Sequence, residues 1–184
     1  MNRTGRALAL GCLLLLQPLM ATAGGNSLLI PAVGRCTLNT SAQALPAALA
    51  ACQQAAKDGD AQAQFELGQF YYDGTRTERD LNQALSYFEQ ASLQGHAEAQ
   101  YHLGTMFFKG EGVAANNIQA YIVLKMAAVN GAEDALDVAD EVSRQMRRED
   151  LEVATQVLGQ IFRKYLLELQ TADGGSRSPF APLP

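Results

Sequence analysis

The sequence predicts an all-α fold, an α/α solenoid built from 36-residue helix-turn-helix repeats. The stretch "GDAQAQFELGQFYYDG" at 59–74 returns as "GHAEAQYHLGTMFFKG" at 95–110, and one register held over ten positions is typical of repeat architecture. Apolar residues make up 48% of the 184-residue chain, but aromatic residues make up only 7% and Trp is absent. Such a core consists mainly of Ala and Leu, which suits closely packed helices. The first members of the repeated pairs are Gly59, Ala61, Ala63, Gln64, Leu67, Gly68, Gly74, Gln83, Ala84 and Ala91, and each second member follows 36 residues later.

Residues 1–23 are predicted to be a signal peptide. Two arginines precede an apolar run that ends near Met20, and "ATA" at 21–23 is a typical A-x-A cleavage site. The mature chain then begins at Gly24 and is located in the periplasm or outside a bacterial cell. Its net charge is −7 instead of −5, because the removed part contains two arginines and no acidic residue.

Two alternatives to cleavage after Ala23 exist. An uncleaved anchor needs about 20 continuous apolar residues, whereas this run is shorter and Pro18 interrupts it. A lipoprotein would be modified at Cys12, which follows a glycine, but only a very short apolar stretch precedes that cysteine. We therefore favour cleavage, with no stable membrane insertion afterwards, and keep the lipoprotein as the less favoured alternative.

The acidic charge of the chain argues against a nucleic-acid partner. Phosphate binding needs clustered Lys and Arg. The only basic cluster, at Arg144, Arg147 and Arg148, is interleaved with Glu141 and Glu149. Such a mixture is typical of a solvated helix face.

Residues 24–44 are predicted to be an extended N-terminal segment, because they lack helical periodicity. Two cysteines survive processing, Cys36 and Cys52, and an even count in an exported chain favours a disulfide. This bond would close a loop of about 15 residues and contribute ~3 kcal/mol of stability. We interpret it as a pin for the segment, since no C-x-x-C motif indicates a redox site.

The helical pattern begins with half a repeat at 45–58, whose register matches the second helix of the repeat. Repeat 1 spans 59–94 and repeat 2 spans 95–130, each with two antiparallel helices. The first helices are expected at about 61–72 and 97–108, with one apolar face turned to the core. That face carries Ala63, Leu67 and Tyr71 in repeat 1, and Ala99, Leu103 and Phe107 in repeat 2.

Capping residues fix the ends of these helices. Each second helix follows an N-cap, Asp80 or Asn116, with Gln three residues later in a variant of the capping box. Gly74 and Gly110 end the first helices, where glycine readily adopts the left-handed conformation. A glycine also ends each second helix, at 95 and 131.

Gly68 and Gly104 lie in the middle of the first helices, where glycine costs ~1 kcal/mol relative to alanine. Its use twice in one register indicates that a neighbouring helix leaves no room for a Cβ atom. We expect the small residues of the second helices to form the other side of this contact. They are Ala84, Ala91, Ala120 and Ala127.

Residues 131–170 are predicted to be a degenerate capping repeat that covers the open end of the core. It comprises a helix within 132–146 and a last helix with a broad apolar face. Residues 171–184 are rich in Gly, Ser and Pro and are predicted to be a disordered tail, in which Phe180 and Leu183 are an alternative docking motif. The apolar face of the last helix carries Leu151, Val157, Leu158, Ile161, Phe162, Tyr165, Leu166 and Leu169.

The repeated pattern A-x-A-Q-[FY]-x-L-G-x(5)-G resembles the Sel-like repeat (SLR) family, a relative of the tetratricopeptide (TPR) repeats. The match covers residues 59–131, with half-repeats at about 45–58 and 132–170. The family's G-x-G-V turn is complete only at 110–113, because repeat 1 has "GTRT" at 74–77. The resemblance implies a right-handed superhelix and an adaptor that holds other proteins together without catalysis. Exported bacterial members occur in flagellar-motor accessories, polysaccharide-export scaffolds and host-interaction factors.

No catalytic constellation is recognisable in the sequence, so we expect no enzyme activity, cofactor or metal. His96 and His102 are six residues apart, which misses the spacing of a helical metal pair, and we expect both to be exposed. No Ser-His-acid arrangement or phosphate-binding loop is present. Cysteine-rich members of the family are associated with penicillin binding, but each of their repeats carries a cysteine pair that these repeats lack. The alternatives to an adaptor are an accessory subunit of a cell-envelope machine and, less favoured, a cell-wall or β-lactam hydrolase.

The first helices are predicted to bind another protein, because in a stacked solenoid they line the concave side. Their solvent-facing stripe, here called the polar track, does not repeat as the core does: Glu66 becomes His102. A core must repeat to stack, whereas a binding surface must differ to be specific. The polar track is Gln62, Glu66, Gln69, Glu98, His102 and Thr105, with Phe70, Tyr72, Met106 and Phe108 as expected apolar anchors at its edge.

Overall fold

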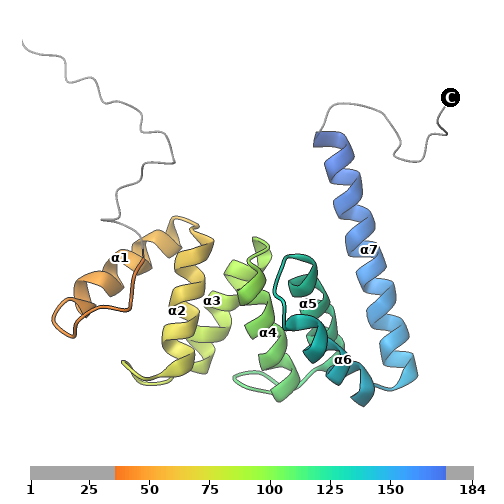
Figure 1. Ribbon diagram of the computed structural model, residues 1–184, viewed down its shortest axis with the longest axis horizontal. Coiled ribbons are helices and arrows are strands. Elements are labelled where there is room, and N and C mark those ends of the chain that lie inside the picture. The colour runs from red at the N-terminus through yellow and green to blue at the C-terminus, as the bar shows by residue number, and fades with distance from the viewer. Residues whose placement is uncertain (1–35, 173–184) are drawn as a thin grey trace, which may run out of the picture. The chain divides into compact units, whose positions relative to one another are not determined.

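The computed structural model describes residues 36–172, all within the unit formed by residues 32–184 (Figure 1). The predicted signal peptide, its cleavage site and most of the segment 24–44 lie outside the described residues. Within 36–172 the chain is all-α and contains no strand. Its helices are α1 (Leu45–Lys57), α2 (Ala61–Asp73), α3 (Leu81–Leu93), α4 (Ala97–Lys109), α5 (Asn117–Val129), α6 (Ala135–Gln145) and α7 (Arg148–Ala172).

The predicted capping residues begin and end the repeat helices. Asp80 accepts hydrogen bonds from the backbone N–H groups of Asn82 and Gln83, and Asn116 accepts one from that of Gln119. Gly74 and Gly110 end α2 and α4 with φ of 62° and 72°. One detail differs from a capping box: the Gln83 side chain donates to the Asp80 carboxylate and does not accept from the Asp80 backbone N–H, which donates to the Tyr71 carbonyl.

The helices form two layers that stack along the repeat axis. α2 pairs with α3, α4 pairs with α5, and each pair packs on the next. The first helices also contact one another, α2 with α4 and α4 with α6, and at the C-terminal end the second-layer helices α5 and α7 contact each other.

Gly68 and Gly104 mark the close helix contacts, as predicted. A Cβ atom at Gly68 would lie 2.6 Å from the Phe88 ring, and one at Gly104 would lie 2.7 Å from Leu124 Cγ. The expected partners were the alanines of the second helices. Those alanines are buried, but the side chains that fill the space are Phe88 and Leu124, which are themselves 36 residues apart.

Two buried glutamines tie successive helices together in the same register. Gln64 donates to the Ala56 carbonyl and accepts from the Gln94 amide, at 3.0 and 2.7 Å. In the next repeat, Gln100 donates to the Ser92 carbonyl and accepts from the Asn130 amide, at 3.0 and 2.8 Å. Each glutamine therefore has hydrogen-bond partners for its buried amide group, and these partners lie near the ends of the helix before it and the helix after it.

The N-terminal end of the stack is held by covalent and polar contacts. Cys36 and Cys52 form the predicted disulfide, with their Cα atoms 4.4 Å apart. Arg76 of the "GTRT" loop donates to the carbonyl groups of Leu38 and Thr40. The first loop thus departs from the G-x-G-V turn because Arg76 binds the segment before α1, while its counterpart Gly112 has a φ of 70°.

The C-terminal end differs from the prediction in two respects. Only Ala154 and Leu158 are fully buried on the described part of α7, although a broad apolar face was expected to cover the core. The reason is the packing partner: α7 lies mainly against α5, so the far half of its apolar face extends past the stack. α7 also continues to Ala172, two residues into the predicted tail.

Candidate protein-binding surface

The polar track lies on two helices of equal length that begin and end at equivalent residues. α2 follows the N-cap Asp60 and α4 follows the N-cap His96, and each cap side chain accepts the backbone N–H group three residues on. Because both helices then have 13 residues before an αL glycine, the 36-residue offset places equivalent side chains on one face. The next helix of the layer continues the register with Asp134, Val138 and Glu141.

The polar track is open to solvent at some positions and covered at others. Gln62 and Glu98 are exposed, and Glu66, Gln69 and Thr105 are partly exposed. His102 is also only partly exposed, because aromatic rings surround it. The structure therefore brings the six predicted residues onto adjacent helices, but it does not leave all of them equally available to a partner.

A polar link crosses the boundary between the repeats at the start of the track. Gln62 donates to Glu66 at 3.0 Å, and its amide oxygen lies 3.0 Å from His96 Nε2. The His96 ring stacks on Phe65 with centroids 4.6 Å apart. Burial lowers the pKa of His96, opposed by the charges of Glu98 and Glu66. With Nδ1 accepting from the Ala99 backbone, a neutral ring protonated at Nε2 satisfies both contacts.

His102 lies in an aromatic cluster and not on an open polar stripe, which corrects the expectation of exposure. Its ring stacks on Phe88 with centroids 5.0 Å apart and planes 6° apart, and it contacts Phe65 and Tyr72 of α2. Burial lowers the pKa of His102, opposed by Glu98 and Asp73. The sequence pattern could not show this, because Phe88 reaches His102 only through the space that Gly68 leaves.

The four expected apolar anchors are also more covered than predicted. Met106 is fully buried in the core, so it is not an anchor. Phe70, Tyr72 and Phe108 are partly buried. Tyr72 donates to Glu111 at 2.6 Å, and burial together with this bond raises its pKa.

Tyr72 serves instead to join the two loops that follow the first helices. Arg79 lies over the Tyr72 ring, 5.1 Å from its centroid, and forms a 3.6 Å ion pair with Glu111. Since Glu111 belongs to the loop of repeat 2, these three side chains hold neighbouring loops in register.

Sequence reasoning missed an acidic hollow at the end of the polar track. It has a volume of about 320 Å³ and lies between the beginning of α4 and the segment before α6. Glu98, Glu133 and Asp134 contribute carboxylates, and Tyr101 contributes a partly exposed ring. The signal was present in the sequence, because Asp134 occupies the register of Glu98 one repeat later. Such a hollow favours a cationic side chain.

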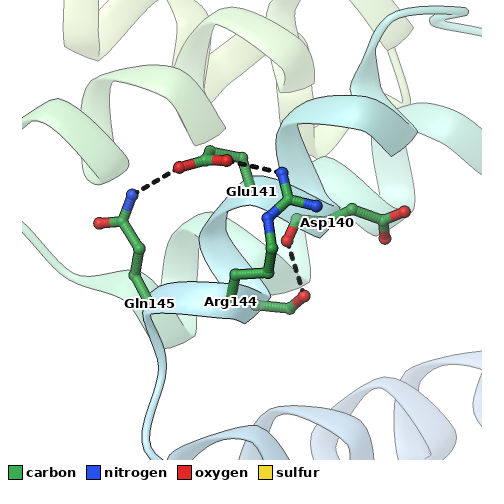
Figure 2. A network of polar contacts seen from close by, with 5 residues as sticks. Asp140, Glu141, Arg144 and Gln145 are labelled. Carbon is green, nitrogen blue, oxygen red and sulfur yellow. Dashed lines mark hydrogen bonds and ion pairs between the residues drawn. The ribbon is translucent and has the colours of Figure 1, made fainter.

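On α6 the continuation of the track is engaged in local contacts. Figure 2 shows Glu141 accepting from Arg144 and Gln145, at 2.6 and 2.8 Å. These bonds lower the pKa of Glu141, Arg144 being the largest cause. The pairs are solvent-exposed and contribute little to stability.

No group of three His, Cys, Asp or Glu side chains within 36–172 is placed to hold a metal ion. None of the helices in that part of the chain has the length and apolarity needed to cross a membrane.

The repeat pattern and the helix pairs agree with comparisons to known proteins. The Sel1 repeat profile matches residues 61–96 and 97–131. The chain is similar to the crystal structure of c5321, a protective antigen present in uropathogenic Escherichia coli strains displaying an SLR fold, with 25% identity and a TM-score of 0.61. That match covers 74% of this chain but only 30% of the antigen.

Shorter similarities extend to two further bacterial structures. A Sel1 repeat protein from Oxalobacter formigenes shares 31% identity over 50% of this chain and 37% of its own length, with a TM-score of 0.48. The cysteine rich protein B of Helicobacter pylori shares 26% identity over 54% of this chain and 72% of its own length, with a TM-score of 0.49. No curated protein matches the sequence.

The fold and the repeated contacts define an all-α helical repeat solenoid. Within that class, the chain is similar to Sel1-like repeat proteins, and its residues 61–96 and 97–131 match the Sel1 repeat.

Proposed function

We propose that this chain is an exported adaptor that holds a segment of another protein on the polar track. The observation that carries the proposal is a comparison of the two repeats: residues in the core are the same at positions 36 apart, whereas residues on the polar track differ. The close-contact glycines and bridging glutamines recur, while the exposed Gln62 is replaced by Glu98 and the partly exposed Gln69 by Thr105. A face under packing constraint would repeat with the core, whereas a face that recognises a partner need not.

The partner is a protein segment with basic side chains. Glu66 and Glu98 are the charged members of the track, and the acidic hollow adds Glu133 and Asp134 beside Glu98. A Lys or Arg of the partner would enter this hollow, and complementary charge raises both specificity and the association rate. The net charge of −5 argues in the same direction and against nucleic acid.

Export is proposed on two grounds. The Cys36–Cys52 disulfide is stable in an oxidising compartment. The N-terminal sequence independently predicts a signal peptide. The proposal includes no catalytic activity.

Site-specific photo-crosslinking in intact cells tests the proposal. A photoreactive side chain at Thr105 on the track is compared with one at Glu89, an exposed position on α3 in the other layer. We expect Thr105 to yield a discrete adduct with one envelope protein, and Glu98→Lys to abolish that adduct. Equal adducts from both positions, or none from Thr105, would overturn the assignment of the polar track.

A further inference from the structure

Three exposed apolar side chains form a row in the second-helix layer. Leu93 lies at the end of α3, Val129 at the end of α5 and Tyr165 on α7, each 36 residues after the last, with exposed fractions of 88%, 65% and 56%. Single exposed apolar residues are ordinary, but a contiguous apolar patch indicates a contact surface. The row begins at α3, because the equivalent residue on α1 is Lys57.

The row borders a hollow of about 290 Å³ between α7 and the ends of α3 and α5. Met126, Ile161 and Phe162 contribute to its lining, and of the described residues that line it none is charged. Leu166, beside Tyr165, is 58% exposed and extends the apolar surface along α7. The site is therefore uncharged and partly aromatic, with apolar side chains beside the amide groups of Gln94, Gln100 and Asn130, and it lies in the layer opposite to the polar track.

We propose that residues 179–184, "PFAPLP", occupy this hollow in the same molecule. The three prolines fix φ and favour an extended polyproline II conformation in the residues that precede them. Pro-rich segments with P-x-x-P spacing, here Pro179 to Pro182, dock in aromatic-lined grooves. Neither the segment nor the hollow carries a charged side chain, so docking buries no charged side chain.

The distances along the chain permit this contact. Tyr165 precedes the end of α7 by seven residues, or about 10 Å along the helix axis. The stretch "DGGSRS" at 173–178 is rich in Gly and Ser, and for such a composition six residues correspond to an end-to-end distance of roughly 13 Å. Six residues of polyproline II then cover about 19 Å, enough to run back along α7 past Tyr165 and Phe162.

The occupant is this segment rather than that of a second copy. A short flexible linker gives an effective concentration in the millimolar range. A second copy at micromolar concentration cannot compete with that for a contact of modest affinity. In this arrangement the segment covers the exposed apolar row of Leu93, Val129 and Tyr165 within the same molecule.

A single tryptophan tests the proposal in the full chain, which otherwise contains none. Phe180→Trp places the reporter in the segment. We expect blue-shifted emission and a several-fold lower acrylamide quenching constant than for a solvated Trp, both independent of protein concentration. Adding Val129→Glu should restore the emission and quenching values of a solvated Trp. The control Val153→Glu makes the same substitution at an exposed position on α7 and should leave the shielding unchanged.

Each other outcome overturns the proposal. A Trp that is solvated in Phe180→Trp itself means that the segment does not dock. Shielding that appears only at high protein concentration assigns the hollow to a second copy. Shielding that survives Val129→Glu, or that Val153→Glu removes as well, means that the segment lies elsewhere. Circular dichroism melts of all variants confirm that loss of shielding is not loss of folding.

Discussion

The two complete repeats, 59–94 and 95–130, share an interior and differ on their open faces. In each, a mid-helix glycine admits one large side chain, and a buried glutamine bridges the helices on either side. On the polar track, by contrast, Glu66 is partly exposed and its counterpart His102 is stacked on Phe88. Stacking therefore keeps the interior of the repeat the same, whereas equivalent positions on the first-helix face differ both in residue type and in how far neighbouring side chains cover them.

The largest expected effect on stability comes from the disulfide. Repeat 1 packs against α1, and the Cys36–Cys52 bond ties α1 to the segment before it. Reduction of the Cys36–Cys52 bond, which spans 16 residues, should lower the free energy of unfolding by ~3 kcal/mol. Hydrogen exchange should accelerate more in α1 and α2 than in α4 and α5. Uniform acceleration in all four helices would mean that the bond supports the whole stack equally.

The shared interior predicts similar costs at equivalent glycines. Gly68→Leu and Gly104→Leu should each destabilise the fold by ~1–3 kcal/mol through overpacking against Phe88 or Leu124. Gly159→Ala is the matched control, because nothing lies within 4 Å of its added Cβ, and it should stabilise by about 1 kcal/mol through helix propensity. Thermal melts measure both, and a raised melting temperature for Gly68→Leu would contradict the packing account.

The bridging glutamines should also behave alike. Gln64→Leu and Gln100→Leu each remove two hydrogen bonds from a buried site, at a cost of ~1–3 kcal/mol. Denaturant unfolding of the two variants measures the costs. A large cost in one repeat and none in the other would break the equivalence of the interiors.

The smallest effect follows from the two histidines of α4, which repeat 1 lacks. Burial lowers the pKa of His96 and His102 below the ordinary value of 6.5, so the unfolded chain takes up protons first as the pH falls. Stability should therefore decrease as the pH falls through about 6.5, by at most ~1.4 kcal/mol per pH unit for each histidine. In the double variant His96→Asp/His102→Gln, the first change copies the N-cap Asp60 of repeat 1. The melting temperature of this variant should depend less on pH than that of the parent. A slope that persists in this variant would assign the effect to other groups.

The sequence predicted the repeat register and the helix ends because these depend on local signals, whereas the disulfide followed from the even number of cysteines that remain after the predicted signal peptide. Capping residues and αL glycines act within a few positions, and the 36-residue offset carries them from one repeat to the next. The core stripe of α2, with Ala63, Leu67 and Tyr71, followed from helical periodicity and is buried.

The burial of the residues beside the core stripe could not be predicted in the same way. Met106 and His102 lie beside the core stripe, and whether such positions are buried depends on side chains from other helices. Phe88 and Phe65 cover His102, and no spacing rule within α4 contains that information. The apolar row at 93, 129 and 165 can be found in the sequence, but only when the 36-residue offset is applied once more, from repeat 2 to the last helix.

The most direct test of the account compares charge reversal on the two layers. Glu66→Lys/Glu98→Lys changes the polar track, and Glu89→Lys/Glu149→Lys makes the same change in net charge at exposed positions of α3 and α7. For the partner identified by crosslinking at Thr105, we expect the first pair to raise the dissociation constant at least tenfold, or about 1.4 kcal/mol. The second pair should leave the affinity unchanged, and both should keep the circular dichroism melt of the parent. Equal affinities for the two variants, or loss of binding only when residues 173–184 are deleted, would contradict the assignment of partner binding to the first helices.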